Sequence, residues 1–138
     1  MQNKYQQTGP ALIERIVAAL SYITFGLAGF IWLLIGLITR KNLKSYLQYH
    51  VFQSIFLSIL YFLVSAFLGL IMNILSLIPF VGQLILRVTF YLNAPMILGF
   101  SLIQGIINVV LIYLVITSLQ GKYSYLPWVS DIIRSNVR

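Results

Sequence analysis

The chain has no cysteine, and only two of its 138 residues, Glu14 and Asp131, are acidic. The absence of cysteine excludes disulfide bonds and thiolate metal sites. Charged residues of either sign make up 8% of the sequence, whereas about a quarter of the residues in a soluble domain are charged. So few charges cannot cover the apolar surface of such a chain, and we therefore expect lipid to be its main solvent.

Long uncharged runs occupy most of the sequence, and hydrophobic residues make up 60% of it. No Lys, Arg, Asp or Glu occurs in residues 16–38, 45–86 or 88–121. Each run exceeds the roughly 20 apolar residues that a helix needs to cross a hydrocarbon core about 30 Å thick. The sequence therefore predicts an all-α integral membrane protein, with residues 1–138 forming a single membrane domain.

Prolines and charged residues divide these runs into helices. Three long transmembrane helices are expected, at about residues 13–38, 45–75 and 96–120. Pro79 and Pro95 bracket a shorter helix at about 80–92, which contains Arg87. A charge near the middle of a bilayer costs about 2.5–3.5 kcal/mol. This helix is therefore predicted to be interfacial or half-inserted, with a fourth span as the alternative.

The two ends of the chain are predicted to be tails, a flexible polar one over residues 1–9 and a C-terminal interfacial one over 121–138. Between them, Arg40, Lys41 and Lys44 form the densest basic cluster, so the positive-inside rule places their loop on the cytoplasmic side. With three spans the C-terminal tail lies on that side and the N-terminal tail on the other, unless the glycine-rich first run folds back on itself. Because basic residues lie at the ends of the apolar runs, the net charge of +7 predicts contacts with lipid headgroups and no nucleic-acid partner.

A stripe of polar and small residues is expected on one face of the second helix. Its members recur at three- or four-residue spacing, with Gln53 at the flank: His50, Ser54, Ser58, Tyr61, Ser65 and Gly69. One interpretation is a seam at which helices pack; the other is a polar track for a translocating substrate. Packing is favoured because Ser65-x-x-x-Gly69 is a common contact pattern between membrane helices. His50 lies near the basic loop, where a headgroup contact or a hydrogen bond at the helix start is expected.

The last long helix offers a matching face, formed by Ser101, Gln104, Gly105 and Asn108. Buried amides in lipid need hydrogen-bond partners, so this face is predicted to meet the stripe of the second helix. Whether the resulting polar seam is dry or water-filled is left open by the residues. The aromatic residues expected at the membrane interfaces are Tyr46, Tyr49, Tyr123, Tyr125 and Trp128.

Catalytic patterns are missing from the sequence. It has no intramembrane carboxylate pair, no cluster of metal ligands, no glycine-rich phosphate loop after a strand, and no nucleophile with an evident base. We therefore expect no enzymatic activity, no catalytic or metal-binding residues, and no cofactor.

Three passages go beyond general hydrophobicity. They are ERIVAALSY at residues 14–22, SYLQYHVFQSIFLSI at 45–59 and GKYSYLPWVSD at 121–131. In this order they resemble the Tic-twenty family, which comprises a protein-import component of the chloroplast inner envelope and its bacterial, chiefly cyanobacterial, relatives. The resemblance implies a helical subunit of a protein-translocation assembly, with four spans and both termini on the inner side. In this chain, about two dozen residues separate Glu14 from Arg40, too few for two full spans.

These observations leave three hypotheses for function. The first, from the resemblance, is a non-enzymatic subunit of a protein-translocation assembly in a bacterial, including cyanobacterial, inner membrane or the plastid inner envelope. The second is a membrane scaffold or assembly factor that binds partner helices. The third is a small transporter, which would have to form a homo-oligomer because so few helices enclose little space. The expected partners are the lipid bilayer, other membrane subunits or further copies, and, in the first case, a translocating polypeptide.

Overall fold

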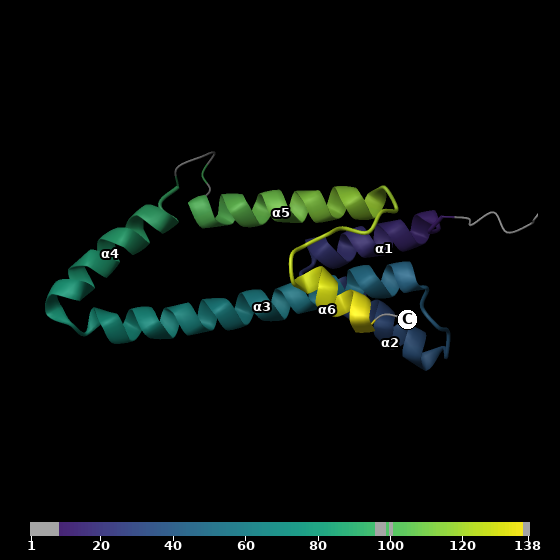
Figure 1. The fold of residues 1–138 in the computed structure, drawn as a ribbon, viewed down its shortest axis with the longest axis horizontal. Coiled ribbons are helices and arrows are strands. Elements are labelled where there is room, and N and C mark those ends of the chain that lie inside the picture. Colours follow the sequence, from purple (N-terminus) through teal and green to yellow (C-terminus); the bar gives the residue numbers. More distant parts are fainter. Residues whose placement is uncertain (1–8, 96–98, 100, 137–138) are drawn as a thin grey trace, which may run out of the picture. The chain divides into compact units, whose positions relative to one another are not determined.

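Six α-helices and no strand are found in the part of the chain that the structure, a computed structural model, describes: residues 9–95, 99 and 101–136 (Figure 1). The helices are α1 (Leu12–Ile23), α2 (Leu27–Ile38), α3 (Ser45–Ser76), α4 (Pro79–Asn93), α5 (Leu102–Leu119) and α6 (Val129–Asn136). The predicted all-α class is confirmed. The chain divides into two compact units: unit 1, Met1–Ser58 with Leu111–Arg138, and unit 2, Ile59–Val110.

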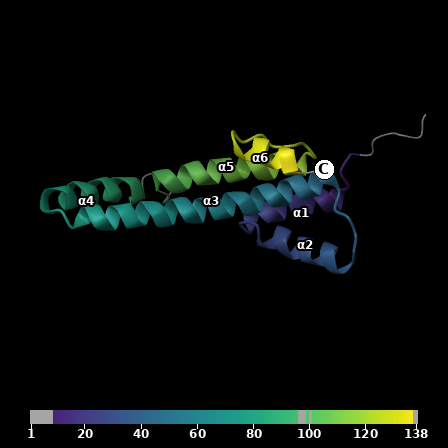
Figure 2. The same cartoon turned by 60° about the horizontal axis from the view of Figure 1, so that its bottom comes forward.

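The predicted continuous helix over residues 13–38 is wrong. Two helices, α1 and α2, take its place, and they fold back on each other in unit 1 (Figure 2). At 1.5 Å per residue, each of these 12-residue helices is about 18 Å long, which is too short to cross a bilayer core of about 30 Å. The first of the three expected long spans is therefore not present as a single helix.

The break between α1 and α2 is caused by the turn at Thr24–Gly26. Phe25 and Gly26 have φ angles of 51° and 88°, a left-handed conformation that ends a right-handed helix. The Thr24 hydroxyl donates to the Leu20 carbonyl at 2.8 Å and accepts from the Ala28 backbone N–H at 2.9 Å, so it serves both helix ends. All residues of this turn are uncharged, so the distribution of charge along the sequence does not mark the break between α1 and α2.

Two of the described helices, α3 and α5, are long and apolar enough to cross a membrane. The α3 bounds agree with the predicted helix at 45–75. The α5 helix begins at Leu102 rather than near residue 96; residues 96–98 and 100 lie outside the described part, and Gly99 has a φ of 81° that interrupts a helix. None of the most apolar 18-residue window of α3 is buried, unlike the core helix of a soluble protein.

The short helix predicted at 80–92 is confirmed as α4. It begins at Pro79, where the missing N–H of proline costs no helical hydrogen bond. Its depth in a membrane stays a prediction. In the predicted C-terminal tail, residues 129–136 form α6, an element that the sequence analysis did not anticipate.

Unit 1 has two apolar core clusters. In the first, Val17 and Ala18 of α1 are buried against Leu47 and Val51 of α3. Gly29 of α2 fits closely into this region, since a Cβ atom there would lie 2.7 Å from Ser21 Oγ and 2.9 Å from Val51 Cγ1. In the second, Tyr49 of α3 packs with Val129 and Ile133 of α6. The C-terminal helix is thus part of the folded unit.

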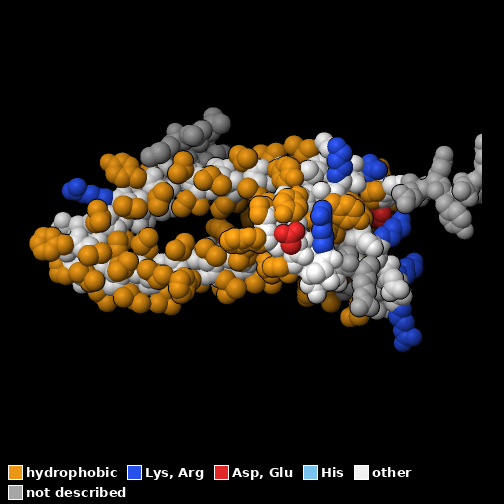
Figure 3. All heavy atoms as spheres, viewed as in Figure 1, with side chains coloured by type: hydrophobic (Ala, Val, Ile, Leu, Met, Phe, Trp, Pro, Cys, Tyr) orange, Lys and Arg blue, Asp and Glu red, His pale blue; other side chains and the backbone are white. Residues whose placement is uncertain are grey.

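Unit 2 has almost no interior of its own. Of its described residues, only Gly82 and Ser101 are buried. Large hydrophobic side chains are left exposed, and Phe80 and Leu77 reach 91% and 81% exposure. Orange apolar side chains accordingly dominate the visible surface of this unit in Figure 3. An apolar surface of this extent needs lipid or protein partners.

Candidate functional site

The first part of the predicted stripe lies in the interior of unit 1. His50 and Gln53 are fully buried and Ser54 is 3% exposed. The residues that they face come from α1 and from the segment after α5. The sequence analysis identified these three residues, but it expected their partners on the face of the last long helix.

Gln53 is the centre of this interior site. Its Oε1 accepts hydrogen bonds from the Tyr22 hydroxyl at 2.8 Å and from the Ser124 hydroxyl at 2.7 Å, and its Nε2 donates to Ser130 Oγ at 3.2 Å. Ser130 Oγ in turn accepts from the Leu126 backbone N–H at 2.7 Å. A single side chain of α3 therefore joins α1, the loop after α5 and the start of α6.

His50 joins the same elements one helical turn earlier. Its Nε2 lies 3.0 Å from the Lys122 carbonyl, and its Nδ1 lies 2.8 Å from the Tyr22 hydroxyl. Because a carbonyl only accepts hydrogen bonds, Nε2 carries the hydrogen and Nδ1 of the neutral ring is an acceptor. The single hydrogen of the Tyr22 hydroxyl is therefore shared between His50 Nδ1 and Gln53 Oε1. The ring is also enclosed by tyrosines: Tyr46 at 4.6 Å and Tyr49 at 5.4 Å between centroids. The hydrogen bonds of His50 are thus made inside unit 1, and its buried ring does not reach lipid headgroups.

Two tyrosines of α3 complete the site. The Tyr49 hydroxyl donates to the Ser124 carbonyl at 2.5 Å, and the Tyr46 hydroxyl donates to the Ser118 carbonyl. Both rings are buried, with 2% and 6% exposure, so they pack inside unit 1 and are not exposed to lipid headgroups as interfacial anchors would be; their depth in a membrane stays a prediction. We call the following set the polar clamp: Tyr22, Tyr46, Tyr49, His50, Gln53, Ser124 and Ser130.

The polar clamp is closed. Among the described residues, every buried side-chain nitrogen or oxygen atom has a hydrogen-bond partner. In a network of this kind each buried polar atom is already engaged by another part of the chain, which fixes one arrangement of its elements. The described residues also contain no group of three or more His, Cys, Asp or Glu that could hold a metal ion. The hydrogen bonds of the clamp thus attach the C-terminal segment to α1 and α3.

The rest of the stripe is not part of the clamp. Ser58 donates to the Phe25 carbonyl at 2.5 Å, and so secures the α1–α2 turn within unit 1. Tyr61, Ser65 and Gly69 belong to unit 2 and are exposed there. Beyond the adjoining backbone of α3, no atom of the described residues lies within 4 Å of a Cβ placed at Gly69. Their role as a contact for a partner helix stays a prediction.

The matching face of α5 has a local function at its start. The Ser101 side chain accepts from the Gln104 backbone N–H at 3.3 Å, and the Gln104 side chain accepts from the Ser101 backbone N–H at 3.2 Å. This reciprocal pair is a capping box, for which Ser-x-x-Gln is the sequence signature. Gly105 and Asn108 are half-buried, and no atom lies within 4 Å of a Cβ placed at Gly105. A seam between this face and α3 remains untested.

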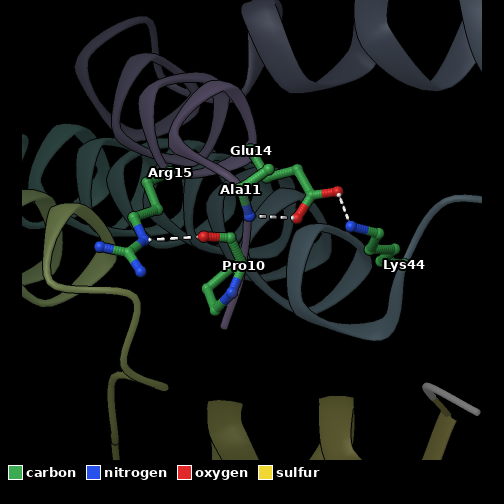
Figure 4. A network of polar contacts seen from close by, with 5 residues as sticks. All are labelled: Pro10, Ala11, Glu14, Arg15 and Lys44. Atoms are coloured by element: carbon green, nitrogen blue, oxygen red, sulfur yellow. Dashed lines mark hydrogen bonds and ion pairs between the residues drawn. The ribbon is translucent and has the colours of Figure 1, made fainter. Parts of the chain in front are cut away.

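The basic loop lies beside the start of α1. Glu14 accepts from the Ala11 backbone N–H through Oε2 at 2.9 Å, and its Oε1 lies 2.9 Å from Lys44 Nζ (Figure 4). Arg15 donates through Nε to the Pro10 carbonyl at 3.0 Å. The Glu14–Lys44 pair brings the beginning of the first apolar run next to the loop that follows its end. The run therefore folds back on itself, which was one of the two alternatives left open by the sequence.

The members of the clamp could be predicted only in part from the sequence. Tyr46 and Tyr49 continue the helical spacing of His50 and Gln53, which is a signal that they share the same face. Tyr22, Ser124 and Ser130 gave no such signal, because they lie 31 to 77 residues away from Gln53.

Comparison with protein-family models, with curated proteins and with solved structures finds no match for this chain.

Proposed function

We propose that this chain is a non-enzymatic helical subunit of a membrane-protein assembly. In this proposal unit 1 is a self-contained anchor, and the helices of unit 2 associate with lipid and with the helices of a partner. The observation that carries the proposal is the exposure of unit 2, in which all described residues except Gly82 and Ser101 have accessible surface left to cover. Lipid alone suits most of these side chains, since they are aliphatic or aromatic.

Protein partners are proposed for one face of unit 2 in particular. Ser65 and Gly69 are spaced by four residues on α3 and lie on a helix whose other exposed side chains include Phe62 and Phe67. Small residues at this spacing let two helix backbones approach closely within a membrane. Because no other part of the described chain lies within 4 Å of a Cβ at Gly69, the approaching helix in this proposal belongs to another molecule.

The narrower proposal, that the assembly translocates proteins, is supported by the resemblance to the Tic-twenty family. It places the chain in a bacterial inner membrane or a plastid inner envelope. The closed clamp argues for a structural role within such an assembly, because a path for polypeptides would need polar groups that are free to contact them. A transporter is less well supported for the same reason.

The orientation that we propose follows from the charges of unit 1. Arg40, Lys41, Lys44 and Lys122 all belong to this unit, and the positive-inside rule places them on the cytoplasmic side of a membrane. The pairing of Glu14 with Lys44 adds the start of α1 to the same side. With α3 and α5 as the two spans, the C-terminal segment returns to this side as well.

Photo-crosslinking tests the proposal. A photoreactive residue at Ser65, incorporated in native membranes, should capture one fixed set of membrane proteins, identified by mass spectrometry. The matched control is Phe67, which is two residues further along α3, about 200° around the helix, and should yield chiefly lipid adducts. Capture of many different unfolded precursor chains at Ser65 would instead establish a translocation path. Lipid adducts at both positions would contradict the proposed partner face.

A further inference from the structure

The loop between α2 and α3 is flanked by two hollows. The first has a volume of about 380 Å³ and the second of about 370 Å³. Gly36, Lys41, Asn42 and Leu43 line both of them. Arg40 and Gln48 line only the first, together with Leu33 and Leu37 of α2. The first hollow therefore has a basic, polar rim and an aliphatic wall.

The charges at the rim of the first hollow are not compensated by carboxylates. The sequence contains two acidic residues. Glu14 is paired with Lys44 in the second hollow, and Asp131 accepts from the Tyr125 hydroxyl on the C-terminal segment. Within the described part of the chain this leaves Arg40 and Lys41, which are adjacent in the loop, without an ion-pair partner.

The aliphatic wall belongs to a helix suited to lipid. The 12 residues of α2 are uncharged, and Leu37 and Leu33 line the hollow directly before the basic loop. A helix with an apolar body and a basic end lies with that end at the level of the lipid headgroups. An occupant of the hollow would thus meet cations at one end and hydrocarbon at the other.

We propose that the first hollow binds an anionic phospholipid. The phosphate lies against Arg40, Lys41 and the amide of Asn42, and the upper part of an acyl chain lies along Leu33 and Leu37. Basic pockets between helices on the cytoplasmic side are suited to anionic headgroups. This inference does not depend on a protein partner, because every residue of the site belongs to unit 1.

Native mass spectrometry of the purified full-length chain in a mild detergent tests the site. With phosphatidylglycerol and phosphatidylcholine added in equal amounts, the chain should retain one phosphatidylglycerol with about a 25-fold preference, because each of the two nearby cations favours an anionic headgroup by about a factor of five. In the double variant Arg40→Asn with Lys41→Gln the preference should vanish. Asparagine is chosen because residue 40 has a φ of 53°, which asparagine tolerates.

A second variant distinguishes a lipid bound in the hollow from a lipid that is attracted only by the positive charges. Gly36→Leu keeps both charges but fills the hollow, and it should also abolish retention. Gly36→Ala is the matched control, because a Cβ there lies 3.5 Å from its nearest neighbours, an ordinary contact, and it should bind as the unchanged chain does. Arg87→Gln, in unit 2, should likewise leave the preference intact.

Three results would overturn the proposal. They are an unchanged preference in the double variant, full retention in Gly36→Leu, and equal retention of the two lipids by the unchanged chain. Competition by glycerol phosphate at the same concentration as the lipid distinguishes a lipid site from a simple phosphate site. Equal displacement by this headgroup alone would show that the aliphatic wall contributes nothing, and would also contradict the proposal.

Discussion

Replacing Gln53 with leucine should lower the free energy of unfolding by about 3 kcal/mol, because three buried hydrogen bonds are lost and each contributes about 1 kcal/mol. Leucine has a volume similar to that of glutamine, so the change removes hydrogen bonds without leaving a large cavity. The hydroxyls affected are those of Tyr22, Ser124 and Ser130. The C-terminal segment should be released first, since both of its serines lose the hydrogen bond that joins them to α3.

Two measurements check the Gln53 prediction. Denaturant titration in detergent gives the change in stability, and hydrogen exchange should show faster exchange of the backbone amides in residues 121–136. The exposed Gln83 of α4, replaced by leucine in the same way, is the control and should change stability by less than about 0.5 kcal/mol. A Gln53→Leu chain as stable as the Gln83→Leu chain would show that the clamp does not hold the segment.

Replacing Gly26 with valine should disrupt the α1–α2 turn and cost about 3–4 kcal/mol, since a β-branched residue is strained at positive φ and the new side chain also overpacks the site. The φ angle of Gly26 is 88°, and a Cβ there would lie 3.1 Å from the Cα of Ile55. That neighbour is the backbone of α3, which cannot move aside as a flexible side chain can. Relief of the strain would require α1 and α2 to separate from α3.

The thermal midpoint of unfolding in detergent measures the Gly26 effect. Gly69→Val is the control, because Gly69 is helical and no atom lies within 4 Å of a Cβ there. Because glycine has a lower helix propensity than valine, Gly69→Val should leave the midpoint unchanged or raise it slightly, by about 0.5 kcal/mol or less in free energy. Equal midpoints for the two variants would mean that the turn at Gly26 contributes nothing to the fold.

The long helices were the most predictable part of this fold. Helix α3 starts directly after Lys44 and ends shortly before Pro79, so charge marks its start and proline its end. The division between α1 and α2 has no such marks. Thr24, Phe25 and Gly26 are uncharged, and a turn made of them is as compatible with lipid as a helix is. Its cause is a backbone conformation, which hydrophobicity does not report.

The candidate site was predictable on one side only. Helical spacing placed His50, Gln53 and Ser54 on the same face of α3, and all three are buried together. Spacing gives no distance to residues in other elements, so it did not identify Ser124 and Ser130. Ser101 and Gln104 show that a polar pair can also have a purely local role. Their spacing suggested a seam between helices, but in the structure they form a capping box at the start of α5.

The central claim is that the polar clamp is a closed structural contact and not part of a water-filled path. Because the chain has no cysteine, single cysteines can report accessibility without background labelling. Ser54 is buried directly after Gln53 of the clamp but is not one of its members, so Ser54→Cys reports on water there without breaking the clamp's hydrogen bonds. Ser135→Cys lies on the exposed surface of α6. In native membranes, a small charged thiol reagent should label residue 135 rapidly, and residue 54 only after denaturation. Labelling of residue 54 at the same rate as residue 135 would show that water reaches the clamp, and would contradict the structural role proposed for it.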